Sequence, residues 1–142
     1  MARLPYLEAD QVAPEYRDIL KRNTNLHKLL VNSPDMARAF NGVGNYIRFK
    51  SKLDPRLREL AILQVGWMEK SEYEFTHHVK IGKEFGVTDA DIADLMAETE
   101  GKPSQLEPLA RAVLKGAREM VRNLDMSEAT FAEIKKQLSD EH

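Results

Sequence analysis

The apolar positions of the chain are densest between Asp54 and Gly86. This stretch begins with Asp54-Pro55, an N-cap residue followed by a proline at the first helical position, which predicts the start of a helix. Apolar residues then occupy nearly every side of that helix as far as Met68. Because a surface helix needs only one apolar stripe, the pattern predicts a helix at the centre of a helical protein or in an interface.

A second helix is predicted from Ser71 to Gly86. Ser71 and Glu74 have the spacing of a capping box, in which a serine is followed three residues later by a glutamate. The apolar face of this helix includes His78, whereas His77 points about 100° away from that face. The two histidines therefore cannot serve one site from a single helix face.

The rest of the chain is organised in shorter amphipathic segments. Residues 1–32 mix prolines with short apolar clusters, which predicts an N-terminal arm of short helices that packs against a body or a neighbouring subunit. Apolar residues at helical spacing continue through a predicted helical core over residues 33–138. Since no period-2 alternation indicates strands, residues 1–142 are predicted to form one all-α domain, a bundle of about six to eight helices.

The composition disfavours several classes of function. The chain has a formal net charge of -2 with acidic and basic residues mixed along it, which disfavours a nucleic-acid partner. Without an apolar stretch of about 18 residues or the apolar segment of a signal peptide, we expect no membrane partner and a cytoplasmic location. The chain contains no cysteine, which excludes disulfides, thiol nucleophiles and cysteine-metal sites.

Candidate acid-base residues gather in the two central helices. Glu74 and His78 lie four residues apart on one helix face, where a carboxylate can orient an imidazole or hold its proton. Glu59 and Ser71 complete the candidate set. Simpler interpretations stay open, because Ser71 and Glu74 can be a capping pair. His78 can equally be a core histidine bonded to a carbonyl, and Glu59 a solvated acid at a helix start.

The same part of the chain allows two further kinds of site. A metal site made of Glu59, Glu74 and His78 offers three ligands but no recognised ligand motif, so no metal is expected. Arg56 and Arg58 can bind a substrate carboxylate, although most arginines at a helix start are solvated or pair with neighbouring acids. The other candidate substrate contacts lie near the junction of the two helices: Trp67, Ser71 and Tyr73.

At these residues the sequence resembles the carboxymuconolactone decarboxylase family, whose members share the all-helical alkylhydroperoxidase-D-like fold. The resemblance is carried by the segments DPRLRELAIL and SEYEFTHHVKIGKEFGV, and a looser likeness extends from Leu4 to Met96. In the peroxidase branch of that family, a glutamate is followed by a Cys-x-x-Cys pair and then by a histidine one helical turn further on. By spacing, the glutamate corresponds to Glu59 and the histidine to His78. Ser71 and Glu74 occupy the two cysteine positions, which removes the thiol chemistry.

The resemblance implies a small cofactor-free enzyme that forms a homotrimer or homohexamer, with sites near the subunit contacts. It favours a decarboxylase or related lyase that acts on a small carboxylated lactone or an intermediate of aromatic catabolism. In this hypothesis His78 protonates the enolate left by the loss of carbon dioxide, and Glu74 or Glu59 sets its tautomer and charge. The alternative is a non-catalytic helical oligomer or small-molecule binding module that shares the fold without the chemistry.

The missing cysteines predict that the protein has no thiol peroxidase activity. The chain has no side chain that can form the sulfenic acid through which a thiol peroxidase works. Incubated with an organic hydroperoxide and a dithiol reductant, the protein should consume peroxide no faster than a heat-denatured sample. Turnover well above that control would contradict the prediction.

Overall fold

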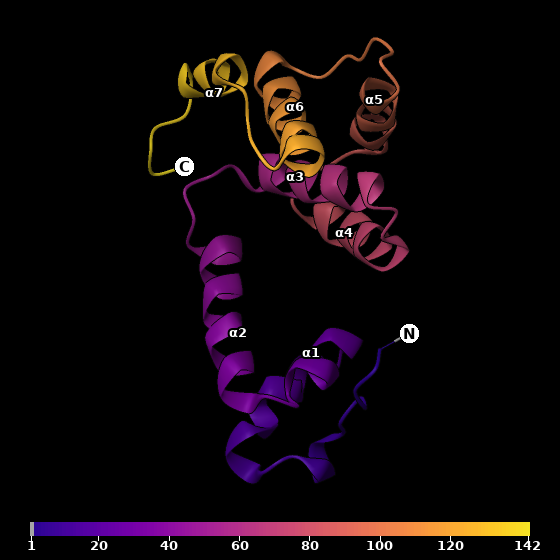
Figure 1. Ribbon diagram of the computed structural model, residues 1–142, viewed down its shortest axis with the longest axis vertical. Helices are drawn as coiled ribbons and strands as arrows, with labels where there is room; N and C mark the ends of the chain where they lie inside the picture. The colour runs from indigo at the N-terminus through magenta and orange to yellow at the C-terminus, as the bar shows by residue number, and fades with distance from the viewer. Residues whose placement is uncertain (1) are drawn as a thin grey trace. The chain divides into compact units, whose positions relative to one another are not determined.

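The computed structural model describes residues 2–142, which divide into two compact units, one that ends at Ser51 and one over Lys52–His142. Over these described residues the chain forms seven α-helices and two 3-10 helices and no strand (Figure 1). The predicted all-α fold class is therefore confirmed. No helix within residues 2–142 has the length and apolar character needed to cross a membrane.

The first unit is a small helical body with its own apolar core. Its helices are η1 (Ala9–Gln11), η2 (Pro14–Arg22), α1 (Asn25–Leu30) and α2 (Pro34–Phe49). The fully buried Ala37 of α2 packs in one cluster with Val12 and Ile19. Helix α2 thus shares its apolar core with the segment that precedes it.

The second unit is built around one buried helix. Its helices are α3 (Pro55–Met68), α4 (Glu72–Glu84), α5 (Asp89–Thr99), α6 (Pro108–Asn123) and α7 (Glu128–Lys135). Within this unit α3 contacts α4, α5 and α6 (Figure 1). The core cluster joins residues from α3, α5 and α6 and from the loops between them: Leu57, Leu60, Leu63, Val87, Leu95, Leu106, Ala110 and Leu114.

Helix α3 begins as its local sequence predicts. The Asp54 carboxylate accepts a hydrogen bond from the Leu57 N–H at 3.0 Å, and Pro55 occupies the first helical position. Leu60 and Leu63 are completely buried, as expected for a helix that is apolar on nearly every side. Burying a leucine side chain stabilises the fold by about 1.5–3 kcal/mol, which explains why this helix organises the unit.

A tight turn joins α3 to α4. Lys70 adopts a left-handed backbone conformation with φ 53, and the Ser71 N–H donates to the Gly66 carbonyl at 3.0 Å. These features are typical of a Schellman motif, in which a left-handed residue ends the helix. Gly66 also permits the close approach of α4, because a Cβ at this position would lie 3.3 Å from the Phe75 backbone nitrogen.

The predicted capping box at the start of α4 is wrong. The side chain of Ser71 makes no capping hydrogen bond within the described part of the chain. The Schellman motif holds Ser71 at ψ 88, whereas Thr88, which does form a capping box with Asp91, has ψ 166. Ser71 is therefore the N-cap residue by position only, and Glu74 is available for another contact.

Candidate functional site

The candidate site lies where α4 packs against α3. Glu59 extends from α3 and has a side chain that is 2% exposed, and His78 extends from α4 and is 19% exposed. Gly82, one turn after His78, lies in a closely packed part of the α3–α4 contact. A Cβ there would lie 3.2 Å from the Val87 side chain and 3.6 Å from the Glu59 Cβ. The glycine therefore lets α4 lie close to the buried carboxylate.

Glu59 and His78 are joined by a direct hydrogen bond, with His78 Nδ1 2.8 Å from Glu59 Oε2. The second carboxylate oxygen of Glu59, Oε1, accepts a hydrogen bond from the Arg58 Nε at 3.0 Å. Because an ionised carboxylate can only accept, Nδ1 of His78 carries the proton that it shares with Glu59. Nε2 is then the ring nitrogen that can exchange a proton with a substrate.

The charge of Glu59 depends on these two donors. Burial raises the pKa of the Glu59 carboxyl group, but the hydrogen bonds and charges of His78 and Arg58 outweigh burial and bring the pKa below its ordinary value. The carboxylate is therefore ionised at neutral pH. The Arg58 guanidinium also lies 4.7 Å from the centre of the Phe85 ring, a favourable cation-π contact for a cation with little access to water.

Glu74 lies on the solvent side of His78. Its side chain is 45% exposed, and its Oε2 is 3.6 Å from His78 Nε2. This distance is too long for a direct hydrogen bond and is suited to contact through a bridging water or a substrate group. The structure thus brings Glu59, Glu74 and His78 together, with a buried carboxylate at one ring nitrogen and an exposed one at the other.

The contacts of Glu59 also bear on whether Glu59, Glu74 and His78 could form a metal site. Over residues 2–142, no group of three or more histidine, aspartate and glutamate side chains is arranged to hold a metal ion. Both oxygens of Glu59 are used, one by His78 and the other by Arg58. The buried carboxylate is therefore committed to hydrogen-bond donors of the protein.

The two arginines proposed to contact a substrate carboxylate are engaged with protein carboxylates. Arg56 forms ion pairs with Asp91 at 2.5 Å and with Glu107 at 2.6 Å. The hydrogen bonds to Asp91 and Glu107 raise the pKa of Arg56 above its ordinary value. Arg58 pairs with Glu59. These contacts match the alternative interpretation, in which arginines at a helix start pair with neighbouring acids.

An apolar hollow of about 610 Å³ lies beside the turn between α3 and α4. Two predicted substrate contacts, Trp67 and Ser71, belong to its lining, and the Trp67 ring lies 5.4 Å from the ring of Phe75. Tyr73 is not among these lining residues and instead stacks on His77 at 5.9 Å. His78, about one turn along α4 from Phe75, is not among the lining residues.

The lining of this hollow contains residues that the sequence did not indicate as site residues. Lys70 and Arg122 bring positive charge to it, and Thr99 brings a hydroxyl group. Arg122 and Thr99 come from α6 and α5, far from Trp67 along the chain. No local spacing in the sequence links such distant positions. The one available signal for this hollow was the apolar end of α3 beside a turn.

Comparison with known proteins shows the family of the chain. A model of the Carboxymuconolactone decarboxylase family matches residues 34–119, more than half of the chain. The chain belongs to this family. The match extends from α2 into α6 and includes every site residue that the sequence predicted, whereas Arg122 of the hollow and the segment before residue 34 lie outside it. Searches of curated proteins and of solved structures return no significant match.

The lowered pKa of Glu59 predicts how its contribution to stability depends on pH. Because the folded-state pKa lies below the ordinary value of 4.5, the unfolded chain binds more protons, and ionised Glu59 favours the folded state above that value. The contribution is lost as the pH falls through the folded-state pKa. The free energy of unfolding of the native protein minus that of Glu59→Gln should therefore shrink between about pH 6 and about pH 3.5.

Denaturant unfolding followed by circular dichroism at each pH measures this difference. Titration of the other carboxylates affects both proteins and cancels in the subtraction. A difference that stays constant or grows on acidification would contradict the prediction.

Proposed function

We propose that the protein is a cofactor-free decarboxylase or related lyase that acts on a small carboxylated lactone or an intermediate of aromatic catabolism. Membership of the Carboxymuconolactone decarboxylase family supports an activity of this general kind. The observation that carries the proposal is the hydrogen bond between buried Glu59 and His78, because it fixes one ring nitrogen and leaves the other for proton transfer.

The reaction needs one positioned acid. Breaking the bond between the carboxylate carbon and the adjacent carbon releases carbon dioxide and leaves an electron pair, which a neighbouring carbonyl accepts as an enolate. In its protonated form, His78 donates a proton from Nε2 to this carbon and is left as the neutral imidazole. Glu59 stabilises the protonated ring before transfer and keeps the Nδ1 proton in place afterwards.

Glu74 is placed to restore the proton. Its carboxylate faces His78 Nε2 at 3.6 Å and is almost half exposed, so it connects the buried pair with water. A carboxylate on this side also stabilises the charged ring after it regains a proton. In this proposal Glu59 positions and polarises the histidine, and Glu74 assists proton exchange with solvent.

In this proposal the body of the substrate binds in the hollow beside the α3–α4 turn. Trp67 and Phe75 offer apolar contact to a ring, and Lys70 and Arg122 offer positive charge to a carboxylate. Arg56 and Arg58 are already paired with acids of the protein, so Lys70 and Arg122 are the better candidates for this task.

A small-molecule binding module is the second candidate function. The hollow of about 610 Å³ favours it, because such a volume can hold a drug-sized ligand without any chemistry. One result distinguishes the lyase from the binding module. Both would bind a carboxylated ring compound in the hollow, but only a lyase would convert it with release of carbon dioxide.

The lyase proposal predicts a large effect of His78→Gln. Glutamine keeps the hydrogen-bonding capacity of the side chain but cannot donate a proton as an acid, so turnover should fall by about 10²- to 10⁴-fold. The measurement is carbon dioxide release from a panel of carboxylated lactones and aromatic acids, followed by kinetics on any compound that is converted.

His77→Gln is the matched control, because His77 lies on another face of α4 and stacks on Tyr73. It should keep turnover close to that of the native protein. Glu74→Gln should lower turnover without destabilising the fold, since Glu74 is not part of a capping box. Native turnover in His78→Gln would contradict the lyase proposal, and unfolding of that variant would favour a structural histidine whose loss leaves Glu59 without a partner.

We also propose that the protein assembles into a homotrimer or homohexamer. Among the exposed apolar side chains of α2 are Met36, Phe40, Val43 and Ile47, which are 46% to 59% exposed. Their spacing places them on one side of the helix, and a continuous apolar strip of this kind marks an interaction surface. Covering it with copies of the same chain removes it from water in a closed assembly.

The assembly proposal predicts that light scattering gives three or six times the chain mass of 16.2 kDa. Val43→Glu places a charge in the apolar strip and should reduce this mass. Asn45→Glu adds the same charge on the opposite face of α2 and should leave the mass unchanged. A native mass near 16.2 kDa at micromolar concentration would contradict the proposal.

A further inference from the structure

A second cavity, of about 550 Å³, lies in the second unit. Its lining includes neither Glu59 nor His78, and it shares no lining residue with the apolar hollow. It is bounded by α6, α7 and the loop that joins α5 to α6. Helix α6 contributes Pro108, Arg111, Lys115 and Arg118, which repeat at the three- and four-residue spacing of one helix face. The cavity is therefore a continuous groove along that face of α6.

Positive charge predominates in this groove although the whole chain is slightly acidic. The charged lining residues are Lys102, Arg111, Lys115, Arg118, Glu98 and Glu133. Lys102 pairs with Glu100, which is outside the lining. Glu133 pairs with Lys136, which is also outside it. Lys115 has a looser contact, at 3.8 Å, with Glu119, which is outside the lining too, so Arg111, Arg118 and Lys115 face one carboxylate of the lining, that of Glu98.

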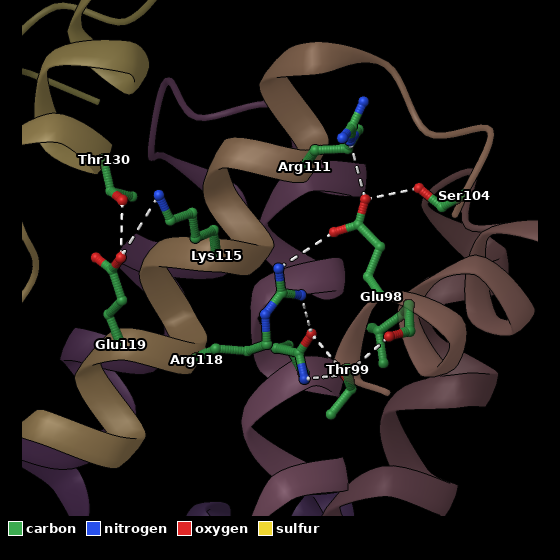
Figure 2. Close-up of polar contacts among 10 residues, drawn as sticks. Glu98, Thr99, Ser104, Arg111, Lys115, Arg118, Glu119 and Thr130 are labelled. Carbon is green, nitrogen blue, oxygen red and sulfur yellow. Dashed lines mark hydrogen bonds and ion pairs between the residues drawn. The ribbon is translucent and has the colours of Figure 1, made fainter. Parts of the chain in front are cut away.

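The Glu98 carboxylate is fully used in holding two of these cations (Figure 2). Its side chain is 9% exposed, and its Oε1 accepts hydrogen bonds from Ser104 at 2.6 Å and from Arg111 Nε at 3.0 Å. Its Oε2 accepts a hydrogen bond from Arg118 Nη2 at 3.2 Å, and Arg118 Nη1 donates to Gln64 at 3.0 Å. Glu98 therefore fixes both guanidinium groups in place before any ligand arrives, which lowers the entropic cost of binding.

Lys115 is not neutralised in the same way. The nearest acid on its helix is Glu119, which accepts hydrogen bonds from the Ser127 N–H and the Thr130 hydroxyl, each at 2.9 Å. Figure 2 shows Glu119 turned toward Thr130, and Lys115 Nζ remains 3.8 Å from its carboxylate. That distance exceeds a hydrogen bond, and the Lys115 side chain is 55% exposed.

Arg111 and Lys115 are suited to bind two anionic groups of one ligand. They lie one turn apart on the same face of α6, and the Arg111 side chain is 59% exposed. Arg111 contacts Glu98 through Nε, so its two terminal amino groups can form a bidentate contact with a carboxylate. Pro103, Ala112 and Ala129 add apolar surface to the lining, which suits a ligand with a hydrocarbon body.

We propose that this groove is a second ligand site, which binds a small organic dicarboxylate through Arg111 and Lys115 and packs the body of the ligand on the apolar lining. Arg118 adds a fixed positive charge along the same face. The site is independent of the lyase proposal, since it uses none of the residues assigned to proton transfer.

Isothermal titration of the full chain with isophthalate, an aromatic dicarboxylate, tests this site. The uncharged diamide of the same compound is the control for the apolar body and should bind much more weakly. Lys115→Gln removes only the 3.8 Å contact with Glu119, whose carboxylate keeps its hydrogen bonds from Ser127 and Thr130, so the fold should be unaffected and the affinity for isophthalate should fall by about three- to tenfold. Arg111→Gln should have at least the same effect, and the double variant a larger one.

Lys80→Gln is the matched control. It removes an exposed cation from α4, outside the groove, and should leave the affinity unchanged. Backbone amide shifts on addition of isophthalate should centre on Ala112 and Ala129 rather than on Trp67. No binding of isophthalate at about 10 mM, equal binding of the diamide, or unchanged affinity in folded Lys115→Gln would overturn the proposal.

Discussion

The second unit depends on a negative charge buried near the start of an apolar helix, α3. Glu59 lies among the leucines of α3 and is 1% exposed, and an ion at such a position is costly unless donors surround it. One donor, Arg58, comes from the same helix, and the other, His78, must come from α4. A slip of α4 by one residue would turn His78 about 100° away and leave the charge incompletely paired. The carboxylate therefore fixes the register of α4 on α3 as well as the orientation of the imidazole.

Contacts at the two ends of α3 extend this arrangement to the rest of the unit. Arg56, near the first turn, links α3 to Asp91 of α5 and to Glu107, which precedes α6. The Asp91 contact is the less exposed of the two, and ion pairs gain strength where water is excluded. At the other end, Gly66 admits the backbone of α4. Both ends of α3 are thus held by short contacts, which keep the Glu59 carboxylate within reach of His78 on α4.

The parts of this structure that the sequence predicted are those set by neighbours in the chain. Asp54 and Pro55 define the start of α3 through contacts within one helical turn. The cap at Ser71 was mispredicted because the preceding helix determines its backbone angles, which no spacing reports. The pairing of Glu59 with His78 across 19 residues depends on packing; the sequence placed both in one candidate set, and the family resemblance supported this, but no spacing predicted the hydrogen bond itself. The contacts of Arg56, at 35 and 51 residues, left no signal in the sequence.

Glu59 and Glu98 show how the partners of a buried carboxylate decide what it can do. Glu98 is held by Arg111, Arg118 and Ser104, none of which gives up a proton near neutral pH. Its surroundings therefore keep one charge state, which suits the binding of a ligand of fixed charge. Glu59 shares its charge between an arginine and a histidine, and histidine is the side chain that exchanges protons most readily in this pH range. This difference is the reason why we propose proton transfer at the Glu59–His78 pair and only ligand binding in the α6 groove.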